Sequence, residues 1–94
     1  MDRRAQIESK LARELEALHV EVVDESHLHA GHAGAAGGGG HFRAVIVSER
    51  FEGLATLARQ RLVYATLAQE LERDIHALSM RTLTPAEWRV PPSS

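Results

Sequence analysis

The sequence predicts an α+β fold in which helices cover one face of a small mixed sheet, giving a sandwich of two layers. Three observations predict this fold: an amphipathic segment near the start of the chain, two segments rich in β-branched residues after it, and a helical segment that leads to a third strand. Strands joined by a loop most simply pair antiparallel, whereas a strand that follows a helical crossover can pair in parallel. With 94 residues, the chain is expected to form one domain.

The first helix is predicted over residues 3–18. Its apolar side chains recur at spacings of three or four residues, which places them on one face. They are Ile7, Leu11, Leu15 and Leu18. The two strands that follow are predicted over residues 19–25 and 41–48, where β-branched side chains gather. The loop between them, residues 26–40, holds six of the seven glycines, so we expect it to be mobile in the free protein.

The second half of the chain is predicted to be helical before its last strand. Residues 54–72 form either one helix or two short helices joined near residues 59–61. The apolar side chains expected on one face of this region are Leu57, Tyr64, Leu67 and Leu71. A third strand is predicted over residues 75–82.

A helix-start signal closes the chain. Thr84 and Glu87 have the spacing of a capping box, and Pro85 occupies the first helical position. A short helix that carries Trp88 is therefore predicted. We interpret Phe51 and Trp88 as anchors in the core or at a hinge, ahead of any binding role.

The composition excludes several classes of protein. There are no cysteines, so the chain has no disulfide and supplies no thiolate to a metal. The formal net charge is −2, and neither half has the positive excess typical of non-specific nucleic-acid binding. No apolar run is long enough for a membrane span and no signal core opens the chain, so we expect a complete cytoplasmic protein with no membrane contact. No nucleophile-and-base constellation occurs, and we expect no enzyme.

Six short strings of residues carry a family resemblance. In chain order they are Asp24-Glu25-Ser26 with His29, His41-Phe42-Arg43, Phe51-Glu52-Gly53, Arg61-Leu62-Val63-Tyr64, Ile75-His76-Ala77-Leu78-Ser79 and Thr84-Pro85-Ala86-Glu87-Trp88. In this order and spacing they resemble the BolA family over nearly the whole chain. The resemblance implies a fold like a class II KH domain, with the order α-β-β-α-α-β and a short C-terminal helix. It also implies a BolA-like domain over residues 1–90, with a flexible His/Gly-rich loop at 26–40, and a short tail at 91–94.

Histidine is the main candidate for chemistry, because imidazole binds borderline metals where no thiol is present. The string His29-Ala30-Gly31-His32 matches the branch of the BolA family that has a histidine in this loop. In that branch, the loop histidine and the histidine of the last strand ligate a [2Fe–2S] cluster, while a monothiol glutaredoxin cysteine and glutathione supply the other ligands. The resemblance therefore implies His29 and His76 as metal ligands. His32 and His41 are expected either to replace one of these ligands or to contact the ligands without binding the metal. The isolated chain is expected to hold no cluster.

Plainer interpretations stay open beside these. A histidine at the start of a strand is often only a polar edge residue, and His27 and His32 are typical of a solvated linker or of an adventitious nickel or zinc binder. Arg59 and Arg61 belong either to a solvated helix face or to a contact with a partner or a nucleic acid. Gln60 stands where the family usually has histidine.

Two functions follow from the resemblance. The first is a non-enzymatic partner of monothiol glutaredoxin in iron–sulfur cluster assembly, trafficking or iron regulation. The alternative is a KH-like, DNA-binding transcriptional regulator of stress or morphology. The free protein is expected to be a monomer or a weak homodimer.

Overall fold

The computed structural model describes residues 3–25, 40–73 and 75–89, and it confirms the predicted α+β class and element order. The elements are α1 (Arg3–Glu14), β1 (His19–Asp24), β2 (Gly40–Val47), the 3₁₀ turn η3 (Glu49–Phe51), α2 (Thr56–Thr66), α3 (Ala68–Arg73), β3 (Ile75–Leu83) and α4 (Pro85–Arg89). Within these ranges, no helix has the length and apolar character needed to cross a membrane.

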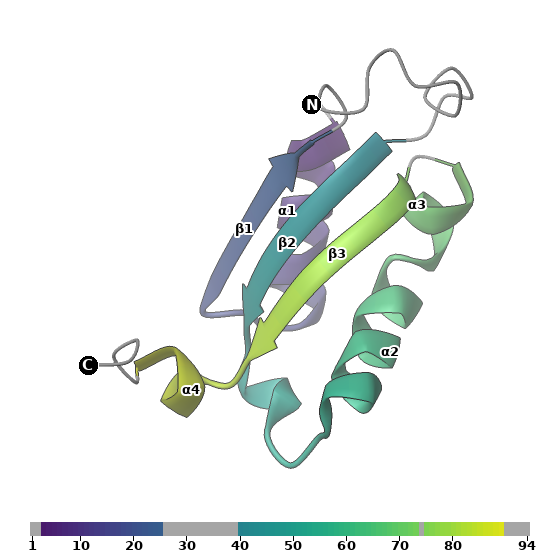
Figure 1. The fold of residues 1–94 in the computed structure, drawn as a ribbon. Coiled ribbons are helices and arrows are strands. Elements are labelled where there is room, and N and C mark those ends of the chain that lie inside the picture. The colour runs from purple at the N-terminus through teal and green to yellow at the C-terminus, as the bar shows by residue number, and fades with distance from the viewer. Residues whose placement is uncertain (1–2, 26–39, 74, 90–94) are drawn as a thin grey trace.

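The sheet has three strands in the order β1-β2-β3, with β2 in the centre. β1 pairs antiparallel with β2, and β3 pairs parallel with β2, as the loop and the helical crossover predict. Figure 1 shows α1 behind β1 and β2 and α2 and α3 beside β3, so that the front face of the sheet is left without a helix. Val63 of α2 shares one core cluster with Ile7 and Leu11 of α1, which places these helices on the same side of the sheet. The two layers are therefore one sheet and one set of helices.

Alternation along β2 decides which side chains enter the core. Phe42, Ala44 and Ile46 are buried and point to the helices, while Arg43 lies between them on the open face and is exposed. The core cluster joins these residues to side chains from α1, β1, η3, α2, the α2–α3 junction and the start of β3. They are Ile7, Leu11, Leu15, Val22, Phe51, Val63, Leu67 and Ile75.

The first helix ends four residues earlier than predicted. Glu16 adopts a φ of 48°, and the Ala17 N–H bonds to the Ala12 carbonyl at 3.0 Å, which together form a Schellman-type helix end. Leu18, expected on the buried face, falls beyond this end and is 55% exposed. Because Glu16 and not a glycine occupies the left-handed position, the sequence carries no signal for the helix end, and the apolar spacing runs on to Leu18.

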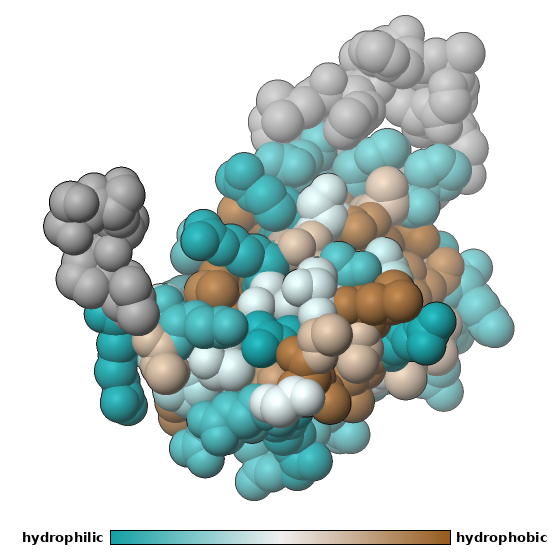
Figure 2. Space-filling view, turned by 60° about the horizontal axis from the view of Figure 1, so that its bottom comes forward, coloured by the Kyte–Doolittle hydropathy of each residue, from teal (hydrophilic) through white to brown (hydrophobic). Residues whose placement is uncertain are grey.

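The crossover contains two helices, but their junction lies at Leu67 and not near residues 59–61. The Thr66 hydroxyl donates to the Leu62 carbonyl at 2.9 Å, a local bond that competes with the regular helix ladder. Leu57 and Tyr64, expected on the buried face, are 58% and 41% exposed, so that expectation is wrong. Figure 2 shows hydrophobic surface mainly on the side where α2 lies in Figure 1.

The predicted capping box opens α4. The Thr84 N–H donates to Glu87 Oε1 at 2.8 Å, and the Glu87 N–H donates to Thr84 Oγ1 at 3.2 Å. Phe51 is buried, as expected, but Trp88 is 47% exposed and stacks on His19 with ring centroids 5.1 Å apart. The interpretation of Trp88 as a core anchor is therefore wrong, because α4 lies at the rim of the sheet and not over the core (Figure 1).

A buried hydroxyl ties three elements together where β2 ends. Ser48 Oγ donates to the Leu15 carbonyl at 2.6 Å and accepts from the Arg50 N–H at 3.0 Å. The Ser48 N–H donates to the Leu83 carbonyl of β3 at 3.0 Å. Ser48 thereby joins the end of α1, the start of η3 and the end of β3.

We predict that Ser48→Ala lowers the free energy of unfolding by about 1–3 kcal/mol, because it leaves a buried carbonyl without its donor. Urea denaturation followed by circular dichroism measures the loss. Ser79→Ala is the matched control, since Ser79 is exposed on β3 and should change stability little. Equal stability of the two variants would contradict the role given to Ser48.

Candidate metal-ligand site

The pairing of β2 with β3 is interrupted where both strands begin. Gly40 is opposite Ile75, but His41 is opposite Ala77, so β3 advances two residues while β2 advances one. His76 is the extra residue of this bulge and has no partner across the ladder. A bulge breaks the strict alternation of side chains and re-aims the residue it contains.

The bulge brings two imidazoles together. The rings of His41 and His76 lie with their centroids 5.2 Å apart and their planes tilted by 43°. His76 is exposed and His41 is half-buried. In the regular register of the rest of the pair, in which Phe42 is opposite Leu78, His76 would be opposite Gly40 and would point to the other face from His41.

Glycine at position 40 permits this arrangement. A Cβ atom there would lie 2.4 Å from Cε2 and 2.8 Å from Cζ of the Phe42 ring, so no side chain fits without displacement of the ring. Phe42 is 2% exposed and belongs to the core. The predicted loop included Gly40, but the structure has it as the first residue of β2. Nothing in the sequence distinguishes Gly40 from the three glycines that precede it.

Two of the predicted ligands lie outside the described residues, namely His29 and His32. The same is true of the predicted mobile loop, apart from Gly40. Among the residues that are described, no group of three or more His, Cys, Asp or Glu could hold a metal ion. The two imidazoles of His41 and His76 are therefore the part of the predicted site that the structure brings together.

Arg59 is held by bonds within the chain. Its guanidinium donates to the Leu54 carbonyl at 2.8 Å, to the Thr82 carbonyl at 3.2 Å and to Glu87 Oε1 at 2.7 Å. It also lies 6.0 Å from the centre of the Phe51 ring, and only 13% of its side chain is exposed. The sequence singled out this residue but gave no signal for the pairing with Glu87.

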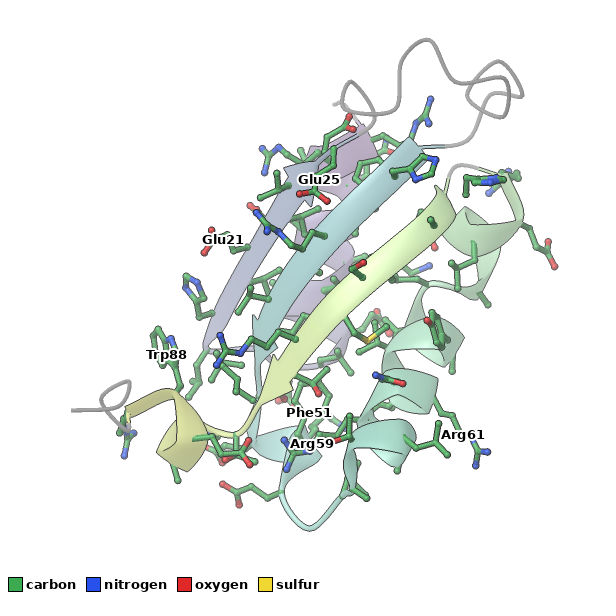
Figure 3. The ribbon with its side chains drawn as sticks, in the orientation of Figure 1. Glu21, Glu25, Phe51, Arg59, Arg61 and Trp88 are labelled. Atoms are coloured by element: carbon green, nitrogen blue, oxygen red, sulfur yellow. The ribbon has the colours of Figure 1, made fainter. Side chains whose placement is uncertain are left out.

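Arg61 has different surroundings. It is exposed on α2 and forms no ion pair with any other residue in the described ranges. Figure 3 shows Arg61 pointing away from the sheet, whereas Arg59 points toward η3 and the end of β3. Of the two predicted contact residues, Arg61 is the one that a partner can reach.

The fold and its paired histidines define a small α+β domain with two imidazole rings in contact at one end of its sheet. The chain belongs to the BolA family, because the family model described as BolA-like protein matches residues 11–87. Human BolA-like protein 1 is 50% identical over 74 residues, which are 79% of this chain but only 54% of the human protein.

Two further relatives cover more of their own length. The DNA-binding transcriptional regulator BolA of Escherichia coli (strain K12) is 45% identical over 85 residues, which are 90% of this chain and 78% of that protein. The solved BolA domain of SufE1 from Arabidopsis thaliana superposes with a TM-score of 0.81 at 42% identity, covering 93% of this chain and 96% of that one.

We predict that Gly40→Ala displaces the Phe42 ring or the bulge, and so changes the contact between His41 and His76. The expected loss of unfolding free energy is about 1–3 kcal/mol, typical of an overpacked core. Imidazole proton resonances and urea denaturation measure the two effects. Gly53→Ala is the control: Gly53 has a φ of 80° and open space around it, so the substitution strains the backbone and leaves both histidine resonances unchanged.

The pairing of Arg59 with Glu87 predicts a dependence of stability on pH. The hydrogen bond from Arg59, and then that from the Thr84 N–H, lower the pKa of Glu87 from 4.5 to about 2. The ionised carboxylate therefore stabilises the fold above the unfolded pKa near 4.5, and this contribution is lost as the pH falls through the folded pKa near 2.

Glu87→Gln should accordingly flatten the plot of unfolding free energy against pH between about 4.5 and 2. Urea denaturation at several pH values measures the slope. The exposed Glu52→Gln serves as control and should keep the wild-type slope. If the Glu87→Gln variant also keeps the wild-type slope of unfolding free energy against pH, the carboxylate is not stabilised by Arg59 in solution.

Proposed function

We propose that this protein is a non-enzymatic, cytoplasmic partner of a monothiol glutaredoxin, with which it shares a [2Fe–2S] cluster in iron–sulfur cluster handling. The observation that supports this proposal is the bulge that sets His76 beside His41 at the end of the sheet where the His29 loop begins and ends. The cluster is cargo that passes between proteins. The domain contributes ligands and a docking surface, and the partner contributes the rest.

The donor set of the chain fits half of such a cluster. Imidazole can replace thiolate on one iron of a [2Fe–2S] centre, which raises its reduction potential, as in Rieske centres. Because the chain has no cysteine, it cannot complete the ligand set alone. A thiolate from glutaredoxin and one from glutathione supply what is missing, as in the BolA proteins with a loop histidine that this sequence resembles.

His76 and His29 have different roles in this proposal. His76 is anchored on β3 at a bulge, so its position is fixed before the partner arrives. His29 belongs to the glycine-rich segment, and its recruitment costs backbone entropy. His76 is therefore the more essential ligand, while His41 supports it by ring contact and His32 can replace His29.

The alternative function is that of a DNA-binding transcriptional regulator, which is how the E. coli relative is named. Arg59, one of the two arginines considered for nucleic-acid contact, is occupied by Glu87 and two carbonyls. Salt titrations of binding to random and promoter DNA test this alternative, because phosphate contacts strengthen at low salt. Negligible affinity at low salt removes it.

We predict that His76→Ala loses the mixed-ligand cluster that wild-type protein forms with monothiol glutaredoxin, glutathione, iron and sulfide. Visible absorption and paramagnetic resonance of the mixture measure the loss. Gln60→His is the matched control, because it adds an imidazole on α2 and should change the spectrum little. Identical spectra from wild-type and His76→Ala protein would end this ligand assignment, and absence of any complex would end the adaptor function.

A further inference from the structure

The three-stranded sheet ends at the outer edge of β3, on the side where α2 lies (Figure 1). Two hydrogen bonds show which backbone groups of β3 face this edge. The Leu83 carbonyl accepts from the N–H of the residue that follows β2, at 3.0 Å, and so faces β2. The Thr82 carbonyl accepts from Arg59 of α2 at 3.2 Å and so faces outward. Because backbone groups alternate in direction along a strand, those of Met80 and Leu78 face outward with Thr82.

The outward backbone groups of Leu78 and Met80 are open to a further strand. Within the part of the chain that the structure describes, no other residue donates to them or accepts from them. A row of unpaired N–H and C=O groups on an edge strand is a template for pairing with another chain. Arg59 occupies the Thr82 carbonyl, so the open stretch has a defined end toward α4.

A groove of about 550 Å³ accompanies this edge, between α2, the second half of β3 and α4. The half-buried Met80 side chain lines the groove and packs against the core cluster, so it offers an apolar contact. In strand addition, main-chain hydrogen bonds supply affinity, and contacts with alternate side chains of the added strand supply specificity. The edge and the groove together provide both kinds of contact.

The charge beside the edge favours an acidic residue in the added strand. Arg81 alternates with the half-buried Met80 and Thr82, is exposed on the open face of the sheet, and forms no ion pair with any residue in the described ranges. Opposite charges that face each other on neighbouring strands stabilise the pairing, and like charges destabilise it. The Glu87 carboxylate also lines the groove, which disfavours a phosphate backbone there.

We propose that the outer edge of β3, from Leu78 to Thr82, docks an extended segment of a partner protein, which adds a fourth strand to the sheet and places an acidic residue opposite Arg81. This interaction goes beyond the proposed function, because it needs neither a cluster nor a glutaredoxin. A second copy of the chain fits this edge less well. Symmetric pairing of two β3 strands would bring the α2 helices of both copies into the same space, since α2 lies beside β3 on the side away from β2 (Figure 1).

The test begins with a selection from short random peptides displayed on phage, using the full chain as the target. The recovered sequences should alternate apolar and polar residues and carry Asp or Glu at one shared position. A synthetic form of a recovered peptide is then added to isotope-labelled protein. The amide resonances of Leu78 and Met80 should shift, and their amide protons should exchange with solvent more slowly than in the free protein.

Charge reversal tests the expected register. Arg81→Glu should weaken binding of the acidic peptide by about fivefold, and it should bind a peptide with Lys at the shared position more tightly than wild type does. Arg43→Glu is the matched control, because Arg43 lies on the same open face but on the central strand, and it should leave both affinities unchanged. Met80→Pro removes one outward N–H, which an edge strand tolerates, and should abolish binding in protein that circular dichroism shows to be folded.

The proposal is overturned if no peptide is recovered, if a bound peptide leaves the Leu78 and Met80 amides unchanged, or if Arg81→Glu alters neither affinity. It is also overturned if these amides are protected in the free protein and lose protection on dilution, which assigns the edge to a second copy. Loss of protection on deletion of residues 90–94 would assign the edge to the end of the chain itself. Protection by a single-stranded oligonucleotide, and by no peptide, would assign it to a nucleic acid.

Discussion

The hydroxyl of Ser48 is buried where three elements meet, and it is the buried polar contact that links the helical layer to the end of the central strand. It donates to the carbonyl of Leu15, the residue that follows α1, and it caps the 3₁₀ turn; the Ser48 backbone N–H bonds to the third strand. These bonds stop β2 at a defined residue and hold α1 against the sheet. Since β2 is the central strand, its buried face of Phe42, Ala44 and Ile46 constrains the register of both its neighbours.

At the other end of β2, Gly40 has no side chain, and the Phe42 ring occupies the space that a Cβ atom would need. Phe42 fills the space over Gly40, and the ladder slips by one residue at that point. Between Ser48 and Gly40 the register is regular on both sides of β2, so the irregularity is confined to the end that carries His41 and His76. The two histidines thus lie at the edge of the core, each next in the chain to a buried residue, Phe42 or Ile75.

The sequence was sufficient for the order of the elements, the strand pairing and the capping box of α4. Each element has a local periodicity in the sequence, the capping box is a local spacing, and the strand pairing follows from what connects each pair of strands. It was not sufficient for the exposure of Leu57 and Tyr64, because α2 turns Val63, and not these two residues, toward the core. Nor could it show the bulge between β2 and β3 or the pairing of Arg59 with Glu87, because both join residues distant in the chain.

The contact between His41 and His76 joins two parallel strands, and the whole crossover of η3, α2 and α3 lies between them in the chain. An unfolded chain holds the two rings apart, because their contact requires closing the long loop formed by the crossover, which costs entropy. The contact between the two rings therefore requires that β3 has paired with β2. The magnetic environment of these two rings is thus a local reporter of the β2–β3 pairing at this end of the sheet.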